Sequence, residues 1–79
     1  MFESLHKPKA LDEDLFENWL EQGRESLLGY QYLLVIWNDL DTEYQPIYLS
    51  SRAELHDYQG SQAEIPVAAY DLYSESKVM

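Results

Sequence analysis

The sequence has no cysteine and few basic residues. Without cysteine the chain of 79 residues forms no disulfide and offers no thiolate ligand to a metal. Lysine and arginine number 5 against 15 aspartates and glutamates, a formal net charge of −10. Because binding to phosphates requires clustered lysine and arginine, we expect no direct binding to nucleic acid. Anionic lipid surfaces would repel the same charge.

A long apolar run is also missing. Met1, Phe2 and Glu3 open the sequence with an acid, and no stretch resembles a signal peptide. No segment reaches the roughly 20 apolar residues that cross a bilayer. We therefore expect a cytoplasmic protein that does not enter a membrane. The length predicts a single small domain over residues 1–79, and a chain of this size buries only about 60% of its unfolded surface.

Motifs for catalysis and cofactor binding are absent as well. His6 and His56 are the only histidines, and their spacing is not that of a zinc site. No serine lies in a G-x-S-x-G elbow, and the 3 glycines are too scattered for a phosphate-binding loop. Asp39, Asp41 and Glu43 alternate as in a calcium loop, but the required glycine and final glutamate are missing. We expect neither an enzyme nor a cofactor.

The apolar content is that of a folded protein, with 46% hydrophobic and 14% aromatic residues. Residues 1–10 are expected to form an arm, because Pro8 breaks a helix there. Apolar residues then recur with helical spacing, which predicts a helix over 11–22 that ends at Gly23. Acids crowd its first turn, where the helix dipole stabilises negative charge. The apolar positions are Leu11, Leu15, Phe16, Trp19 and Leu20.

A β-hairpin is predicted next. Residues 29–37 are rich in aromatic and β-branched residues and apolar on both faces, which indicates a central strand covered on both sides. The polar segment 38–43 forms the loop, and a second strand begins at Tyr44. Pro46 cannot donate to a ladder and therefore places this second strand at an edge.

A short helix and a third strand follow. Ser51 and Glu54 match the S-x-x-E capping box of a helix that Gly60 closes. Segment 64–73 alternates as a strand does, and Pro66 again indicates an edge. Its alanines leave helix as an alternative over residues 67–76.

These elements predict an α+β fold in the order α-β-β-α-β, with a mostly antiparallel three-stranded sheet in the order 2-1-3. A right-handed crossover makes strand three parallel to strand two and places both helices on one face. The other face of the sheet would then be bare, although the central strand is apolar on both sides. A homodimer or another partner would cover it, or else the arm and the C-terminal segment would. We expect Trp19 and Trp37 to be buried and the polar tail, 74–79, to be frayed.

The acidic residues are concentrated in one part of the sequence. They lie on the outer face of the first helix and continue through the hairpin, with no basic residue between Arg24 and Arg52. Such a charge keeps a small protein soluble, and it also steers the protein toward cationic surfaces. Carboxylates spaced several ångströms apart can take the place of phosphates in a basic groove.

Glu25-Ser26-Leu27-Leu28 resembles the Glu-Ser-Ile-Leu segment of the uracil-DNA glycosylase inhibitors, small acidic α/β proteins of phages and mobile elements that imitate DNA. In that family the segment is an edge strand that enters the enzyme's DNA groove. The resemblance covers these residues, the size, the charge and the mixed architecture, and it implies that Glu25 and Ser26 contact the enzyme. The family has a helix between this segment and the next strand, whereas here Gly29 leads directly into a strand.

The sequence thus predicts a non-enzymatic acidic protein that binds and inhibits a basic nucleic-acid-binding protein or enzyme, in the manner of a DNA mimic. A small bacterial structural or regulatory module that forms a homodimer through an apolar sheet face is the alternative. The candidate partner-binding residues are Asp12, Glu13, Glu17, Glu21, Glu25, Ser26, Asp39, Asp41, Glu43 and Tyr44.

Overall fold

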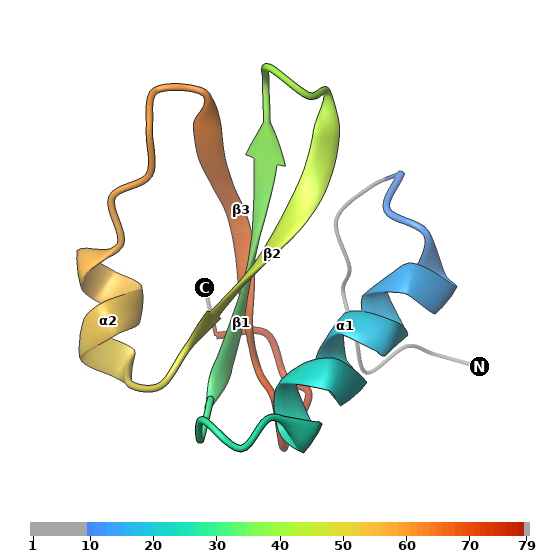
Figure 1. Ribbon diagram of the computed structural model, residues 1–79, viewed down its shortest axis with the longest axis vertical. Helices are drawn as coiled ribbons and strands as arrows, with labels where there is room; N and C mark the ends of the chain where they lie inside the picture. Colours follow the sequence, from blue (N-terminus) through green and yellow to red (C-terminus); the bar gives the residue numbers. More distant parts are fainter. Residues whose placement is uncertain (1–9, 79) are drawn as a thin grey trace.

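Two helices and three strands follow one another in the predicted order α-β-β-α-β (Figure 1). The computed structural model describes residues 10–78, so most of the predicted N-terminal arm lies outside the described residues. Neither helix in this part of the chain is long and apolar enough to cross a membrane. The elements are α1 (Glu13–Glu25), β1 (Tyr32–Asn38), β2 (Glu43–Leu49), α2 (Arg52–Asp57) and β3 (Glu64–Asp71).

The strands form one sheet in the order β2-β1-β3, as the sequence predicts. Both outer strands are antiparallel to β1, and they are therefore parallel to each other. Pro46 pairs with Val35 and Pro66 with Ile36, so each proline lies on an edge strand, where a missing N–H costs no ladder bond. Residues 64–71 are thus a strand and not a helix.

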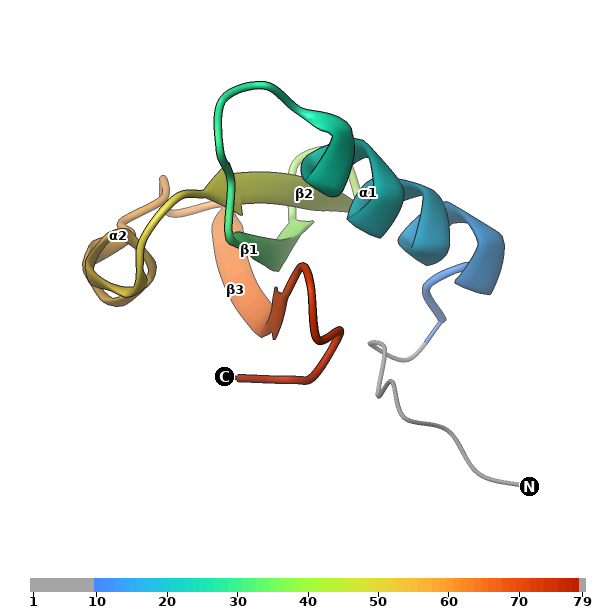
Figure 2. The same ribbon diagram turned by 90° about the horizontal axis from the view of Figure 1, so that it is seen from below.

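The two helices cover opposite faces of the sheet, as Figure 2 shows from below. Alternate residues of a strand point to opposite sides. Leu33 and Val35 pack in one cluster with α1, whereas Leu34 and Ile36 pack in another with Leu55 of α2. The α1-side core consists of Leu11, Phe16, Trp19, Leu20, Leu33, Val35, Ala68, Tyr70 and Leu72, and the α2-side core of Leu34, Ile36, Leu55 and Ala69.

The prediction that both helices share one face is therefore wrong. Crossover handedness governs only the helix inside the crossover, which is α2. Helix α1 precedes the hairpin, so its face is decided by where its apolar stripe finds a matching surface. The expected bare face does not exist, because α2 covers it and the half-buried Val78 packs against the same core.

Helix α1 continues two residues past Gly23, where the sequence predicts its end. Gly23 is buried, and a Cβ atom there would lie 2.8 Å from Cε1 of Tyr48 and 2.9 Å from Cδ1 of Leu72. The glycine therefore serves close packing and not a left-handed helix end. Asp12 caps the start of α1 by accepting from the N–H of Asp14, and Ser26 caps its end.

The predicted N-cap of α2 is confirmed, because the Ser51 hydroxyl accepts from the N–H of Glu54 at 3.2 Å. The Glu54 carboxylate reaches back one residue beyond the N-cap and accepts from the N–H of Ser50 at 2.8 Å. The helix ends at Asp57 with Tyr58 as its C-cap, and not at Gly60. It spans only 6 residues and buries only Leu55.

The tail that the sequence predicts to be frayed is hydrogen-bonded to β3 through residue 78. The N–H of Val78 donates to Ala69 O at 2.8 Å, and Lys77 forms a β-bridge with Tyr70. Arg24 holds the intervening turn to α1, because its Nη1 donates to Leu72 O at 3.0 Å and to Glu75 Oε2 at 2.8 Å.

Candidate protein-binding surface

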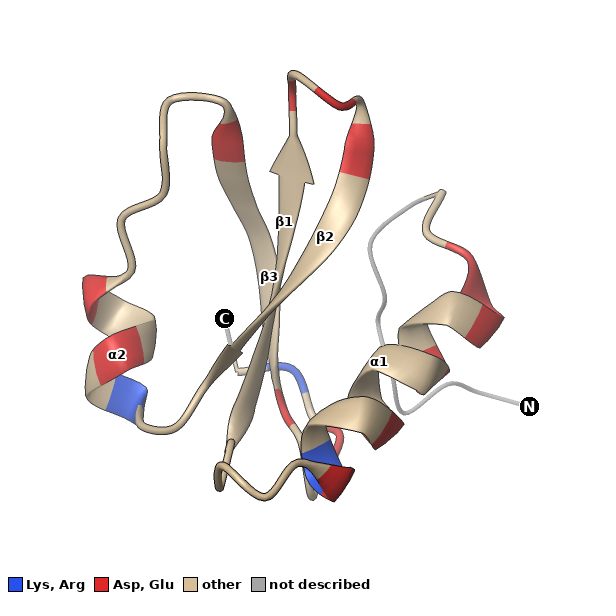
Figure 3. Ribbon diagram, in the orientation of Figure 1, with Lys and Arg blue, Asp and Glu red and all other residues tan. Residues whose placement is uncertain are grey.

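The outer side of α1 carries a regular series of carboxylates. Glu13, Glu17, Glu21 and Glu25 are four residues apart, and all are exposed. Four residues of an α-helix rise about 6 Å, so these side chains follow one another along the helix. We call this series the glutamate ladder. Figure 3 shows acidic residues along the whole length of α1.

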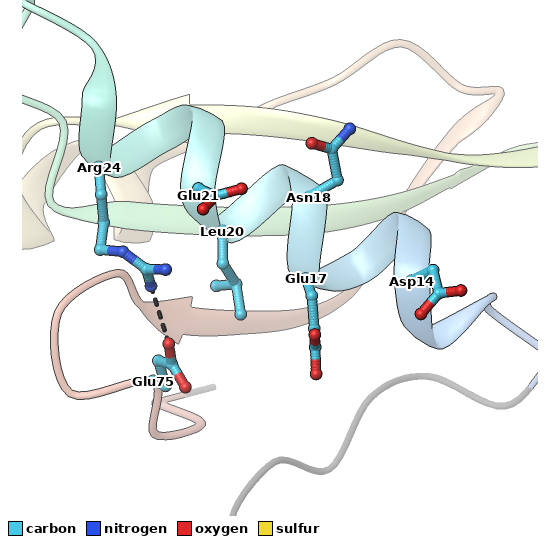
Figure 4. Close-up of a pocket in the computed structure, with 7 residues that line it drawn as sticks. All are labelled: Asp14, Glu17, Asn18, Leu20, Glu21, Arg24 and Glu75. Atoms are coloured by element: carbon cyan, nitrogen blue, oxygen red, sulfur yellow. Dashed lines mark hydrogen bonds and ion pairs between the residues drawn. The ribbon is translucent and has the colours of Figure 1, made fainter.

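No cation neutralises the ladder within residues 10–78. The only ion pair in this part of the chain joins Arg24 to Glu75, outside the ladder (Figure 4). Arg52 lies over the Tyr32 ring, with its guanidinium carbon 5.8 Å from the centroid. Like charges four residues apart repel by about 0.2–0.5 kcal/mol per pair. Repulsion within the ladder therefore destabilises the isolated helix.

A hollow of about 460 Å³ lies beside the ladder, between α1 and the turn that contains Glu75. Its lining is mainly acidic, but it also contains Arg24, which is paired with Glu75. The described residues contain no group of three or more histidines, aspartates or glutamates placed to hold a metal ion. The residues that line this hollow are Asp14, Glu17, Asn18, Leu20, Glu21, Arg24 and Glu75.

The acids of the hairpin are held by amide groups. Gln45 Nε2 donates to Asp41 Oδ2 at 3.2 Å and to Glu43 Oε2 at 3.0 Å. The Asn38 side chain accepts from the backbone N–H of Asp41 at 3.1 Å and so closes the turn. The alternating acids thus bind a side-chain amide within their own hairpin.

An apolar hollow of about 410 Å³ separates the start of α1 from the hairpin. Trp37 and Tyr44 line it with their rings edge to face, 5.0 Å between centroids, and Leu15 is 40% exposed. The prediction of two buried tryptophans is confirmed for Trp19, which is 7% exposed, but Trp37 is only half-buried. Trp37 lies near the end of β1, beyond the residues that α1 covers fully. The residues among 10–78 that line it are Ala10, Leu11, Asp12, Leu15, Trp37, Thr42, Glu43 and Tyr44.

The segment that resembles the glycosylase inhibitors is a helix end followed by a turn. Glu25 is the last residue of α1, and the Ser26 hydroxyl accepts from the N–H of Leu28 at 3.1 Å. Leu27 is fully exposed and Leu28 is 72% exposed. The segment is not an edge strand in this protein.

The structure places most candidate residues along α1 or at its two ends, and Asp39 and Asp41 in the hairpin turn. Asp12 meets Glu43 and Tyr44 in lining the apolar hollow, whereas Glu25 and Ser26 lie at the opposite helix end. The rest of the ladder joins the two ends. Leu15 belongs to the apolar face of the predicted helix and Trp37 is predicted to be buried, and nothing in the sequence distinguishes them from neighbours that are fully covered.

The chain gives no significant match to any protein-family model, any curated protein or any solved structure. No relative therefore supplies an activity or a partner.

Proposed function

We propose that this protein binds a basic surface of a nucleic-acid-binding protein or enzyme and inhibits it by occupying the site of the nucleic acid. The observation that supports this proposal is the glutamate ladder, exposed along α1 and without a cationic partner in residues 10–78. Such a role would place it among the small acidic inhibitors of phages and mobile elements, acting in the cytoplasm.

The physical basis is the relief of repulsion on binding. The ladder carboxylates repel one another in the free protein, and a basic groove would replace that repulsion with attraction. A net charge of −10 on so small a body also raises the rate of encounter with a cationic surface. Leu27 and Leu28 add exposed apolar area at one end of the ladder, where contact with the partner would slow dissociation.

The homodimer alternative loses the observation that suggested it. It required a bare apolar face on the sheet, but Leu33, Leu34, Val35 and Ile36 of β1 are all 0% exposed. No other feature of the described residues favours it.

The proposal is tested by affinity capture from a bacterial lysate followed by mass spectrometry. We expect a basic, nucleic-acid-binding prey whose capture falls steeply between about 50 and about 200 mM salt, because the contacts are electrostatic. Duplex DNA should compete with the protein for the purified prey. Recovery of the protein itself alone, or of a prey whose capture is insensitive to salt, would overturn the proposal.

Two variants with equal net charge localise the interaction. Glu17→Gln combined with Glu21→Gln removes two ladder charges, and Asp57→Lys makes the same change in net charge from exposed α2 on the other side of the sheet. If each exposed ion pair contributes about 0.2–1 kcal/mol, the ladder variant should bind the prey roughly two- to thirtyfold more weakly. The α2 variant should retain normal affinity. Equal weakening by both would mean that only total charge matters.

A further inference from the structure

The apolar hollow at the start of α1 is a distinct feature from the glutamate ladder. Its walls are the rings of Trp37 and Tyr44 and the partly exposed side chain of Leu15. A volume of about 410 Å³ is within the usual range of ligand pockets, roughly 300–1,000 Å³. It therefore has room for one long side chain of a partner.

The aromatic walls are held in place. The two ring planes meet at 72°, so Trp37 and Tyr44 form a corner. The indole Nε1 of Trp37 donates to Asp39 Oδ1 at 3.1 Å, which fixes the orientation of the ring and places a carboxylate at its edge. A group that enters the hollow thus meets preformed aromatic surface.

The charged residues among 10–78 that line the hollow are anionic. Asp12 and Glu43 are among its lining residues, and no lysine or arginine of residues 10–78 lines it. Aromatic rings attract a cation over their faces, and adjacent carboxylates accept its hydrogen bonds. A guanidinium suits this combination better than an ammonium, because it is planar, stacks on rings and is more weakly hydrated.

We propose that this hollow receives an arginine side chain of the basic partner. The inference rests on the proposed function, since it names a chemical group of the same partner. The ladder provides attraction that depends little on geometry, whereas the hollow binds one side chain in one place. The hollow would therefore set the register in which the partner lies along α1.

The test is a titration of the ¹⁵N-labelled full chain with tetra-arginine amide, followed by NMR. The reporter is the indole N–H of Trp37, which a Trp37→Phe variant assigns. We expect its signal to shift saturably, together with the amides of Leu15 and Tyr44. Tetra-lysine amide carries the same charge. Its dissociation constant, read from the shift of the Trp37 indole signal, should be roughly two- to fivefold higher, because ammonium groups stack less well on aromatic rings.

A Tyr44→Leu variant separates the hollow from the ladder, because leucine keeps the wall apolar and removes the ring. It should lose most of the Trp37 response and keep the shifts along Glu17 and Glu21, with an otherwise unchanged spectrum as the control for folding. Equal responses to tetra-lysine, or shifts confined to the ladder, would overturn the arginine assignment and leave the proposed function standing. A response at Trp37 only after deletion of residues 1–9 would mean that the chain's own N-terminal segment is the occupant, which overturns the proposal. If no signal shifts either at the hollow or along the ladder, the result counts against both proposals.

Discussion

The two faces of the sheet are built unequally. Helix α1 spans 13 residues and brings its own apolar stripe to a core that contains the rings of Phe16, Trp19 and Tyr70. Helix α2 spans 6 residues and contributes only Leu55, so half-buried side chains complete its core. The glutamate ladder lies on the helix with the larger core. Apolar burial on one side of α1 thus offsets the repulsion among the acids on its other side.

The strongest test of this asymmetry compares truncations in the two cores. Trp19→Ala should reduce the free energy of unfolding by about 3–5 kcal/mol, which is enough to unfold so small a domain. Leu55→Ala should cost about 2–3 kcal/mol, because half-buried neighbours can move into the space. Urea unfolding followed by circular dichroism measures both. A larger loss for Leu55→Ala would reverse the ranking of the two cores.

Gly23→Ala probes how closely α1 approaches the sheet. Alanine is the better helix former by about 1 kcal/mol. The new methyl group would nonetheless overlap Tyr48 and the buried Leu72, and overpacking costs typically about 1–3 kcal/mol. We expect net destabilisation in thermal unfolding. Gln22→Ala, at the exposed neighbouring position, should instead leave the melting temperature unchanged or slightly higher. A Gly23→Ala protein as stable as the Gln22→Ala control would show that the Tyr48 and Leu72 side chains move aside at little cost in free energy.

Tyr48→Phe tests the bond that joins β2 to α1. The Tyr48 hydroxyl donates to Trp19 O at 2.7 Å, and its loss should cost about 0.5–1.5 kcal/mol at neutral pH.

The same variant should also change how the free energy of unfolding depends on pH in the alkaline range. Burial raises the pKa of Tyr48, so the folded state holds the proton more tightly than the unfolded state does. The resulting stability is complete below pH about 10 and is lost as the pH rises through the higher folded-state pKa. Tyr48→Phe should make stability fall less steeply above pH about 10, although burial also raises the pKa of Tyr70. An unchanged slope would mean that Tyr48 does not contribute to it.

Removing a ladder charge should stabilise the fold slightly. Glu17 has ladder neighbours four residues away on both sides, so Glu17→Gln relieves two like-charge pairs. At about 0.2–0.5 kcal/mol per pair, the free energy of unfolding should rise by a few tenths of a kcal/mol up to about 1 kcal/mol at low salt. High salt should remove the gain. A loss of stability at low salt would show that Glu17 has a favourable contact in the folded state.

The smallest expected effect concerns the cap of α2. The pKa of Glu54 is lowered, chiefly because its carboxylate accepts from the backbone N–H and the hydroxyl of Ser50. The lowered pKa means that the ionised Glu54 carboxylate stabilises the folded state. This stabilisation is present above the unfolded-state pKa and is lost as the pH falls through the lower folded-state pKa. Glu54→Gln should remove this acid dependence and increase hydrogen exchange in α2 while α1 is unaffected. Equal exchange in both helices would mean that the cap supports the whole fold.

Local rules explain the parts of the fold that sequence patterns predicted correctly. Proline lacks a donor, so Pro46 and Pro66 identified the edge strands whatever packed around them. The N-cap of α2 depends only on residues within one turn. Gly23 was misread because its role depends on Tyr48 and Leu72, which are distant in the sequence. Part of the candidate site was likewise predictable: Glu13, Glu17 and Glu21 follow from helical spacing. Glu25 joins the ladder only because α1 continues past Gly23, and the apolar hollow requires α1 to begin beside the hairpin.

By itself the sequence determined the order of elements, the sheet order, and the acidic outer face of α1 as far as Glu21, because helical and strand periodicity are local properties. Only the tertiary structure decided that α1 and α2 lie on opposite faces, since no chain-local rule selects the face on which a leading helix packs. That choice buries both sides of β1 and leaves Trp37 and Tyr44 lining a hollow beside Asp12.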